Sequence, residues 1–125
     1  MENERIRGTL SMGEEFENEE MVTAAMQIIM NAGDARLKVK DALKLGKAFD
    51  FENAGAKMEE ARKCIAQAHH AQTDIIQSEA GGKKYEFSLL FAHAQDTLMT
   101  IMSELNLAKE LIAFFEIMNK KIEEK

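Results

Sequence analysis

Apolar residues recur at spacings of three and four positions along three long stretches of the chain. This spacing places side chains on one face of an α-helix. The pattern therefore predicts three helices, from about residue 16 to 45, from about 51 to 78, and from between 85 and 88 to about 122. The expected inner positions are Val22, Ala25, Ile29, Ala32, Arg36, Val39 and Leu43, then Ala54, Met58, Ala61, Ile65, Ala68, Gln72 and Ile75, then Phe87, Phe91, Ala94, Leu98, Ile101, Leu105, Ala108, Ile112 and Phe115.

Two short breaks, at residues 46–50 and 80–84, separate the predicted helices. Gly46 fits the end of the first helix, and the carboxylate of Asp50 fits the N-cap of the second, where it can accept backbone N–H groups. Connections this short place consecutive helices antiparallel. Proline is absent and good helix formers are abundant. We therefore predict an all-α fold, an antiparallel up-down-up three-helix bundle.

The length of 125 residues is enough for one domain, which we place at residues 16–125 after a flexible acidic arm at residues 1–15. The single Cys64 excludes an internal disulfide and suits a reducing cytoplasm. No apolar run approaches the roughly 20 residues that cross a bilayer, and the first residues lack the apolar core of a signal peptide. We expect a cytoplasmic protein with no membrane insertion. The net charge of -6 argues against a nucleic-acid partner.

The third predicted helix is apolar on more than one side. Leu89, Leu90, Met99, Met102 and Leu111 lie off its main stripe. A helix that is apolar over most of its circumference requires burial all round, which three helices in one small bundle cannot supply. We therefore expect self-association that buries the surplus apolar surface between copies. The alternative is that the nine methionines serve only as adaptable core packing.

His93 and Asp96 place polar chemistry in this otherwise apolar helix. Because residues three apart share a helix face, the imidazole and the carboxylate project side by side. An imidazole can act as a general base, as a metal ligand, or as a nucleophile that accepts a phosphoryl group. The short motif has low specificity, so spacing alone favours a structural histidine.

Asp96 requires a partner, because an unpaired carboxylate on an apolar face is costly. His93 is one candidate, and Arg36 on the inner face of the first helix is another. In a symmetric trimer, three copies of Asp96 could instead meet on the axis. Like charges at that range either take up protons or hold a cation, and an oxygen cluster suits Mg²⁺.

Other catalytic motifs are absent from the sequence. His69 and His70 are adjacent, so on a helix they face different directions and cannot easily chelate one ion. There is no Cys-x-x-Cys, no His-Glu-x-x-His and no glycine-rich phosphate loop. Three helices also offer no strand-to-helix elbow for a Ser-His-Asp hydrolase.

Three separated segments resemble the IIA component of the lactose/cellobiose (chitobiose) family of the bacterial sugar phosphotransferase system. They are Asn-Ala-Gly-Asp-Ala-Arg at residues 31–36, Ala-Gln-Ala-His-His-Ala-Gln-Thr at 66–73, and Ala-His-Ala-Gln-Asp-Thr-Leu-Met-Thr at 92–100. The resemblance covers about residues 19–116. It implies a cytoplasmic homotrimer of three-helix subunits that relays phosphate from phospho-HPr to the IIB component during uptake of a β-disaccharide.

The resemblance also implies residue roles. His93 would accept the phosphoryl group, and Asp96 would bind one divalent cation, Mg²⁺ by expectation, on the axis of each trimer. His69 and Gln72 match a family segment that would lie near the phosphorylation site. The chain departs from the family at Thr97, where a second histidine is usual, and at Gln67, where a glutamate is common.

Two other functions are compatible with the sequence. One is a non-catalytic helical interaction module in which His93 and Asp96 only satisfy each other. The other is a regulator that uses the same phosphorylation as a signal. Nothing in the sequence names the sugar, whether cellobiose, chitobiose or lactose in type.

Overall fold

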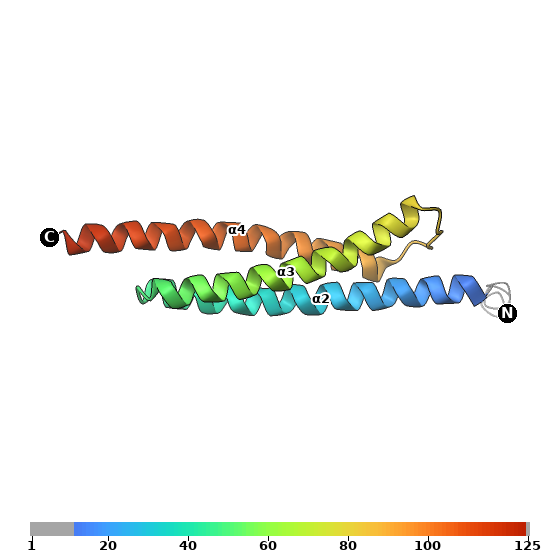
Figure 1. Cartoon of the computed structure of the whole chain (residues 1–125), viewed down its shortest axis with the longest axis horizontal. Coiled ribbons are helices and arrows are strands. Elements are labelled where there is room, and N and C mark those ends of the chain that lie inside the picture. Colours follow the sequence, from blue (N-terminus) through green and yellow to red (C-terminus); the bar gives the residue numbers. More distant parts are fainter. Residues whose placement is uncertain (1–11, 125) are drawn as a thin grey trace.

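The part of the chain that the structure describes forms three long helices (Figure 1). The computed structural model describes the backbone of residues 12–124 and the side chains of residues 19–124. The helices are α2 (Met12–Lys47), α3 (Phe51–Ala80) and α4 (Leu89–Glu123), and this described part contains no strand. α3 runs back along α2, and α4 runs parallel to α2. The predicted all-α, up-down-up arrangement is confirmed.

The first helix starts earlier than the sequence pattern indicated. α2 begins at Met12, whereas the expected start was near residue 16. One glycine, Gly13, costs a helix only about 1 kcal/mol, which is too little to end it. The remainder of the expected arm, residues 1–11, lies outside the described residues.

Side chains cap the second and third helices as local chemistry predicts. Asp50 accepts a hydrogen bond from the backbone N–H of Asn53 at 3.3 Å, which confirms the expected N-cap. Ser88 does the same for the N–H of Phe91 at 3.1 Å and fixes the start of α4. Each bond satisfies a backbone donor that the first helical turn leaves without a partner.

Gly46 serves close packing rather than helix termination. α2 continues through Gly46 to Lys47, and the left-handed residue of the turn is Phe49, with φ of 64°. A Cβ atom added at Gly46 would lie 3.1 Å from a ring carbon of Phe115 and 3.3 Å from Ile112. Glycine therefore lets α4 approach the end of α2.

A side chain at position 46 is expected to destabilise the bundle. Gly46→Leu should lower the free energy of unfolding by about 1–3 kcal/mol, because overpacking forces the Phe115 ring to move. Gly55→Ala is the matched control, since a Cβ there meets nothing within 4 Å. That change should raise stability by about 0.5–1 kcal/mol. Urea denaturation measures both, and a fully stable Gly46→Leu protein would contradict the close approach.

The core follows the predicted stripes with two exceptions. Ile28, Leu98 and Ile101 are its largest fully buried side chains. Val22 and Phe87 were expected inside but are 49% and 86% exposed. Phe87 precedes α4, so helical periodicity does not apply to it. Met21 is buried in place of Val22, because α2 packs against both other helices and buries a wider face.

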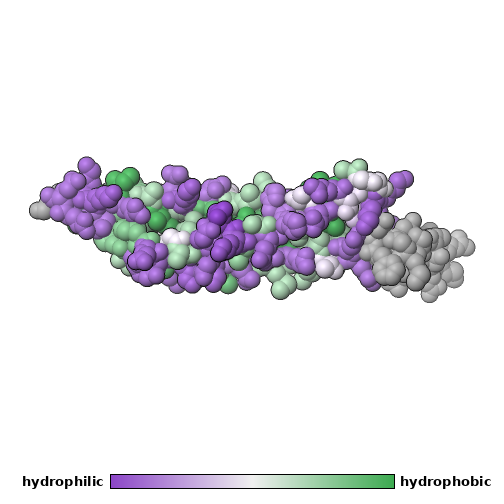
Figure 2. Space-filling view, in the orientation of Figure 1, coloured by the Kyte–Doolittle hydropathy of each residue, from purple (hydrophilic) through white to green (hydrophobic). Residues whose placement is uncertain are grey.

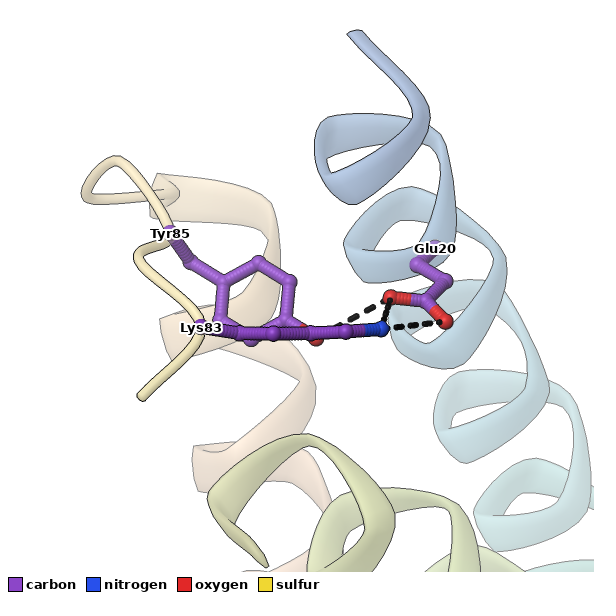
Figure 3. A network of polar contacts seen from close by, with 3 residues as sticks. All are labelled: Glu20, Lys83 and Tyr85. Atoms are coloured by element: carbon purple, nitrogen blue, oxygen red, sulfur yellow. Dashed lines mark hydrogen bonds and ion pairs between the residues drawn. The ribbon is translucent and has the colours of Figure 1, made fainter. Parts of the chain in front are cut away.

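A polar network ties the α3–α4 connection to α2 (Figure 3). Lys83 Nζ lies 3.1 Å and 3.3 Å from the two carboxylate oxygens of Glu20. The hydroxyl of Tyr85 donates to the same carboxylate at 3.1 Å. The hydrogen bond from Lys83 has the larger effect and that from Tyr85 adds to it. Together they lower the pKa of the Glu20 carboxyl below its ordinary value of 4.5. The network holds the segment that leads into α4.

The contribution of Glu20 to the stability of the fold should depend on pH. Because its pKa is lower in the folded state, its carboxylate stabilises the fold above the ordinary value of 4.5 and loses that effect as pH falls through the folded pKa. Glu20→Gln should therefore melt at a lower temperature than the natural chain at neutral pH, and the difference should vanish in acid. Parallel thermal melts test this, and a constant difference at all pH values would contradict it.

No helix in residues 12–124 is long and apolar enough to cross a membrane.

Candidate functional site

His93 lies in the second turn of α4, close behind the Ser88 cap. Its side chain is exposed. Its backbone carbonyl accepts a hydrogen bond from the hydroxyl of Thr97 at 2.8 Å. Thr97 thus bonds to the helix backbone, and the imidazole has no hydrogen-bond or ion-pair partner among the described residues. A free imidazole on a rigid helix is accessible to another protein surface.

Asp96 is exposed as well, and neither side-chain partner suggested by the sequence pairs with it. Within the described part of the chain, no hydrogen bond or ion pair joins it to His93. Arg36 instead donates to both carboxylate oxygens of Glu104, at 3.0 Å and 2.9 Å. That bond raises the pKa of the Arg36 guanidinium. Arg36, one of the alternative partners that the sequence offered for Asp96, pairs with Glu104 instead, because α2 and α4 pack with Arg36 level with Glu104.

His93 and Asp96 belong to a face of α4 that its own bundle does not cover. Ala94, Leu98 and Ile101 point into the core from the opposite side of the helix. The uncovered positions recur at spacings of three and four. They are Leu89, His93, Asp96, Thr100, Ser103, Leu107, Leu111, Phe114 and Met118, and all are exposed. We call them the outward face of α4. It is mainly polar in its first half and apolar in its second.

Surplus apolar surface is present, as the sequence indicated. Leu89 is 77% exposed and Leu107 is 64% exposed, and α2 adds Met26, Met30 and Leu37. Figure 2 shows hydrophobic patches between hydrophilic ones on the side of the bundle seen there. One chain therefore leaves side chains uncovered that a larger assembly would bury.

Within the described residues, no group of three or more His, Cys, Asp or Glu side chains comes together in a way that could hold a metal ion. The Asp96 carboxylate is exposed and unpaired, so it is free to meet its copies. Carboxylate oxygens are the ligands that Mg²⁺ prefers. The residue thus fits a cation site that is completed only by other chains.

The two histidines of α3 are engaged locally. The Nδ1 atom of His69 lies 3.4 Å from the hydroxyl of Thr73, and the Nε2 atom of His70 lies 3.6 Å from a carboxylate oxygen of Asp74. Each histidine thus contacts the residue four positions later on its own side of α3. The two rings therefore make separate local contacts, His69 with Thr73 and His70 with Asp74.

Gln72 has a polar feature that the sequence did not predict. Its side-chain oxygen Oε1 is buried and has no hydrogen-bond partner among the described residues. An unsatisfied buried acceptor typically costs about 1–3 kcal/mol. The only signal in the sequence was an amide within the apolar stripe of α3. No hydrogen bond links Gln72 to His93 within the described chain.

Open grooves between α2 and α3 and between α2 and α4 are lined by described residues other than His93. A groove of about 660 Å³ between α2 and α3 contains Glu20, Gln27 and Asp74. A groove of about 530 Å³ between α2 and α4 contains the Arg36–Glu104 pair beside Leu107 and Leu111. The candidate site is therefore an exposed side chain on a helix and not a small-molecule cavity.

Comparison with known proteins agrees with this geometry. Residues 23–116 match the family model "PTS system, Lactose/Cellobiose specific IIA subunit". The lichenan-specific phosphotransferase enzyme IIA component of Bacillus subtilis is 42% identical over 99 residues, which are 79% of this chain and 90% of that protein. The matched part contains both His93 and Asp96.

Solved structures show the same fold. The cellobiose-specific enzyme IIA of Bacillus anthracis superposes with a TM-score of 0.76 at 35% identity, over 92% of this chain and 98% of that one. The IIA(Chitobiose)–HPr complex of the Escherichia coli phosphotransferase system superposes with a TM-score of 0.70 at 38% identity, over 79% of this chain and 96% of the matched chain.

Proposed function

Because the chain belongs to the lactose/cellobiose-specific IIA family of the sugar phosphotransferase system, we propose that it carries a phosphoryl group on His93. The observation that carries this proposal is the exposed imidazole on α4, which has no partner within the described chain. A solved relative is a complex with HPr, which supports phospho-HPr as the donor. The IIB component is the proposed acceptor.

The proposed reaction is two transfers of one phosphoryl group. A ring nitrogen of neutral His93 attacks the phosphorus of phospho-HPr while the bond from phosphorus to the donor breaks. The group then leaves the imidazole for a nucleophile on IIB, and no redox change occurs. In-line transfer requires close approach of two protein surfaces and positioning more than a deep pocket. The exposed position of His93 meets that requirement.

Self-assembly and a cation complete the proposal. Three chains pack along the outward faces of α4 around one axis and form a homotrimer, in which Asp96 faces the axis and His93 lies at the boundary between subunits, open to its partners. Asp96 from each chain then meets its copies, and one Mg²⁺ per trimer offsets two of the three negative charges. The support is the exposure of Asp96 together with that of Leu107 and Leu111 on one face. The cation serves assembly, and His93 carries the phosphate.

The proposed cellular role is uptake of a β-disaccharide of the cellobiose, chitobiose or lactose type, with the carrier in the cytoplasm beside its donor. The relatives named above are specific for lichenan, cellobiose and chitobiose. Relatives of similar identity to this chain are thus named for different sugars. The sugar is therefore best tested by transport with each candidate IIB and membrane component.

The direct test is phosphate incorporation. Incubation of the chain with phosphoenolpyruvate, Enzyme I and HPr should add one acid-labile phosphate per chain. Transfer onward to a IIB component should then remove it. No incorporation under these conditions would refute the carrier role and would favour a non-catalytic interaction module. Incorporation without onward transfer to any IIB would favour a regulator.

A further inference from the structure

Thr97 is the nearest side chain on α4 that can donate a hydrogen bond beside His93. The positions of α4 that share a face with His93, three and four residues away, are Leu89, Leu90, Asp96 and Thr97. The two leucines carry no polar group, and a carboxylate such as that of Asp96 only accepts hydrogen bonds. Among these four neighbours, the Thr97 hydroxyl is therefore the one donor available to an anion on the imidazole.

The hydroxyl of Thr97 is a spare donor in the unphosphorylated chain. It donates to the backbone carbonyl oxygen of His93 at 2.8 Å. Both residues lie inside α4, where the same carbonyl also accepts the backbone N–H of Thr97 in the regular helical pattern. Because the helix already satisfies this carbonyl, the hydroxyl can turn away from it without leaving a backbone acceptor unpaired.

The side chain of Thr97 lies within reach of a phosphoryl group on the ring of His93. Helical side chains lean toward the N-terminus, so Thr97 leans over the turn that holds His93. The Cβ atoms of residues one turn apart are about 5–6 Å from each other. A phosphoryl group lengthens the histidine side chain and adds three strong acceptor oxygens. The exposed imidazole has no partner among the described residues and is free to turn toward Thr97.

We propose that Thr97 binds the phosphoryl group of phosphorylated His93. Its hydroxyl turns from the backbone carbonyl and donates to a phosphoryl oxygen, with no covalent change at Thr97. A charged acceptor makes a stronger hydrogen bond than a neutral carbonyl, so the exchange stabilises the phosphorylated chain. This inference rests on the proposed function, in which His93 carries the phosphate. Thr97 is also a position where the chain departs from the usual histidine, so the family match assigns it no role.

The test measures how phosphate divides between HPr and the full-length chain. Phospho-HPr is mixed with the chain, and intact-mass measurement at neutral pH gives both phosphorylated fractions at equilibrium. Thr97→Val keeps the shape of the side chain and removes the hydroxyl. It should lower the equilibrium constant for transfer to the chain about fivefold or more, whereas Thr97→Ser should stay within about twofold of the natural value. Thr23→Val, in the groove between α2 and α3, is the control and should change nothing.

The outcomes separate this inference from the proposed function. A natural chain that takes up no phosphate would overturn both. Phosphate uptake with the same equilibrium constant in Thr97→Val and the natural chain would overturn the Thr97 contact and leave the carrier role standing. A loss in Thr97→Ser or in Thr23→Val as large as that in Thr97→Val would also overturn the contact, because the hydroxyl beside His93 would not be its cause.

Thermal melts distinguish the phosphoryl contact from a purely structural role of Thr97. The unphosphorylated Thr97→Val and natural chains should melt at nearly the same temperature, because the lost hydrogen bond is the second one to the His93 carbonyl. A lower melting temperature in Thr97→Val together with an unchanged equilibrium constant for transfer would show that the hydroxyl only supports the helix.

Discussion

His93→Gln is expected to incorporate no phosphate from phosphoenolpyruvate, Enzyme I and HPr, whereas the natural chain should incorporate one per chain. The amide of glutamine has hydrogen-bonding groups of similar reach but no nucleophilic ring nitrogen. Because His93 is exposed and its side chain packs against no core residue, its replacement should leave the fold intact. Radiolabelled phosphate or intact-mass measurement gives the readout.

His70→Gln is the matched control for this experiment. His70 is an exposed histidine on α3, and its Nε2 atom lies 3.6 Å from Asp74. Its loss should leave incorporation at one phosphate per chain. If His93→Gln still accepted phosphate and His70→Gln did not, the acceptor would lie on α3 and the proposed site on α4 would be wrong.

Asp96→Asn is expected to abolish binding of the proposed divalent cation while the chain keeps its helices. Asparagine preserves the size of the side chain, but three neutral amides hold Mg²⁺ far more weakly than three carboxylates. The metal content of the purified trimer, measured by elemental analysis, should fall from one ion per three chains to almost none. Since the change also removes like-charge repulsion on the axis, the variant should stay trimeric without metal.

Removal of the proposed cation by chelation should affect the natural chain and the Asp96→Asn variant differently. Chelation should weaken the natural trimer, because three uncompensated carboxylates then repel one another, and should have no effect on Asp96→Asn. Asp74→Asn is the control, since Asp74 is an exposed carboxylate on α3. Unchanged metal content in Asp96→Asn would place the cation elsewhere. Dissociation of that variant at every concentration would show that the carboxylate itself holds the trimer together.

In the proposed function, phosphate transfer and cation binding divide between two neighbours on one helix face. His93 and Asp96 do not pair within the described chain, so each is free to act on a different partner. The polar half of the outward face of α4 carries the proposed chemistry, and its apolar half carries the proposed assembly. This division explains how one helix can be apolar on two sides in a small protein.

The sequence alone determined the elements of the fold. Helical spacing located the three helices, and Asp50 capped α3 as predicted, because periodicity and capping depend on residues within a few positions of one another. The same spacing placed Leu98 and Ile101 in the core. Three separated segments, at residues 31–36, 66–73 and 92–100, carried the family resemblance, which the match of residues 23–116 to the family model confirms.

Only the tertiary structure decided which side chains meet between helices. Arg36 pairs with Glu104 instead of Asp96, Glu20 holds Lys83 and Tyr85, and Gly46 makes room for Phe115. These contacts depend on the axial offset and the rotation of one helix against another, which the pattern of a single helix does not contain. For the same reason, the sequence could place His93 and Asp96 on one face, but only the packed bundle showed that this face is left uncovered.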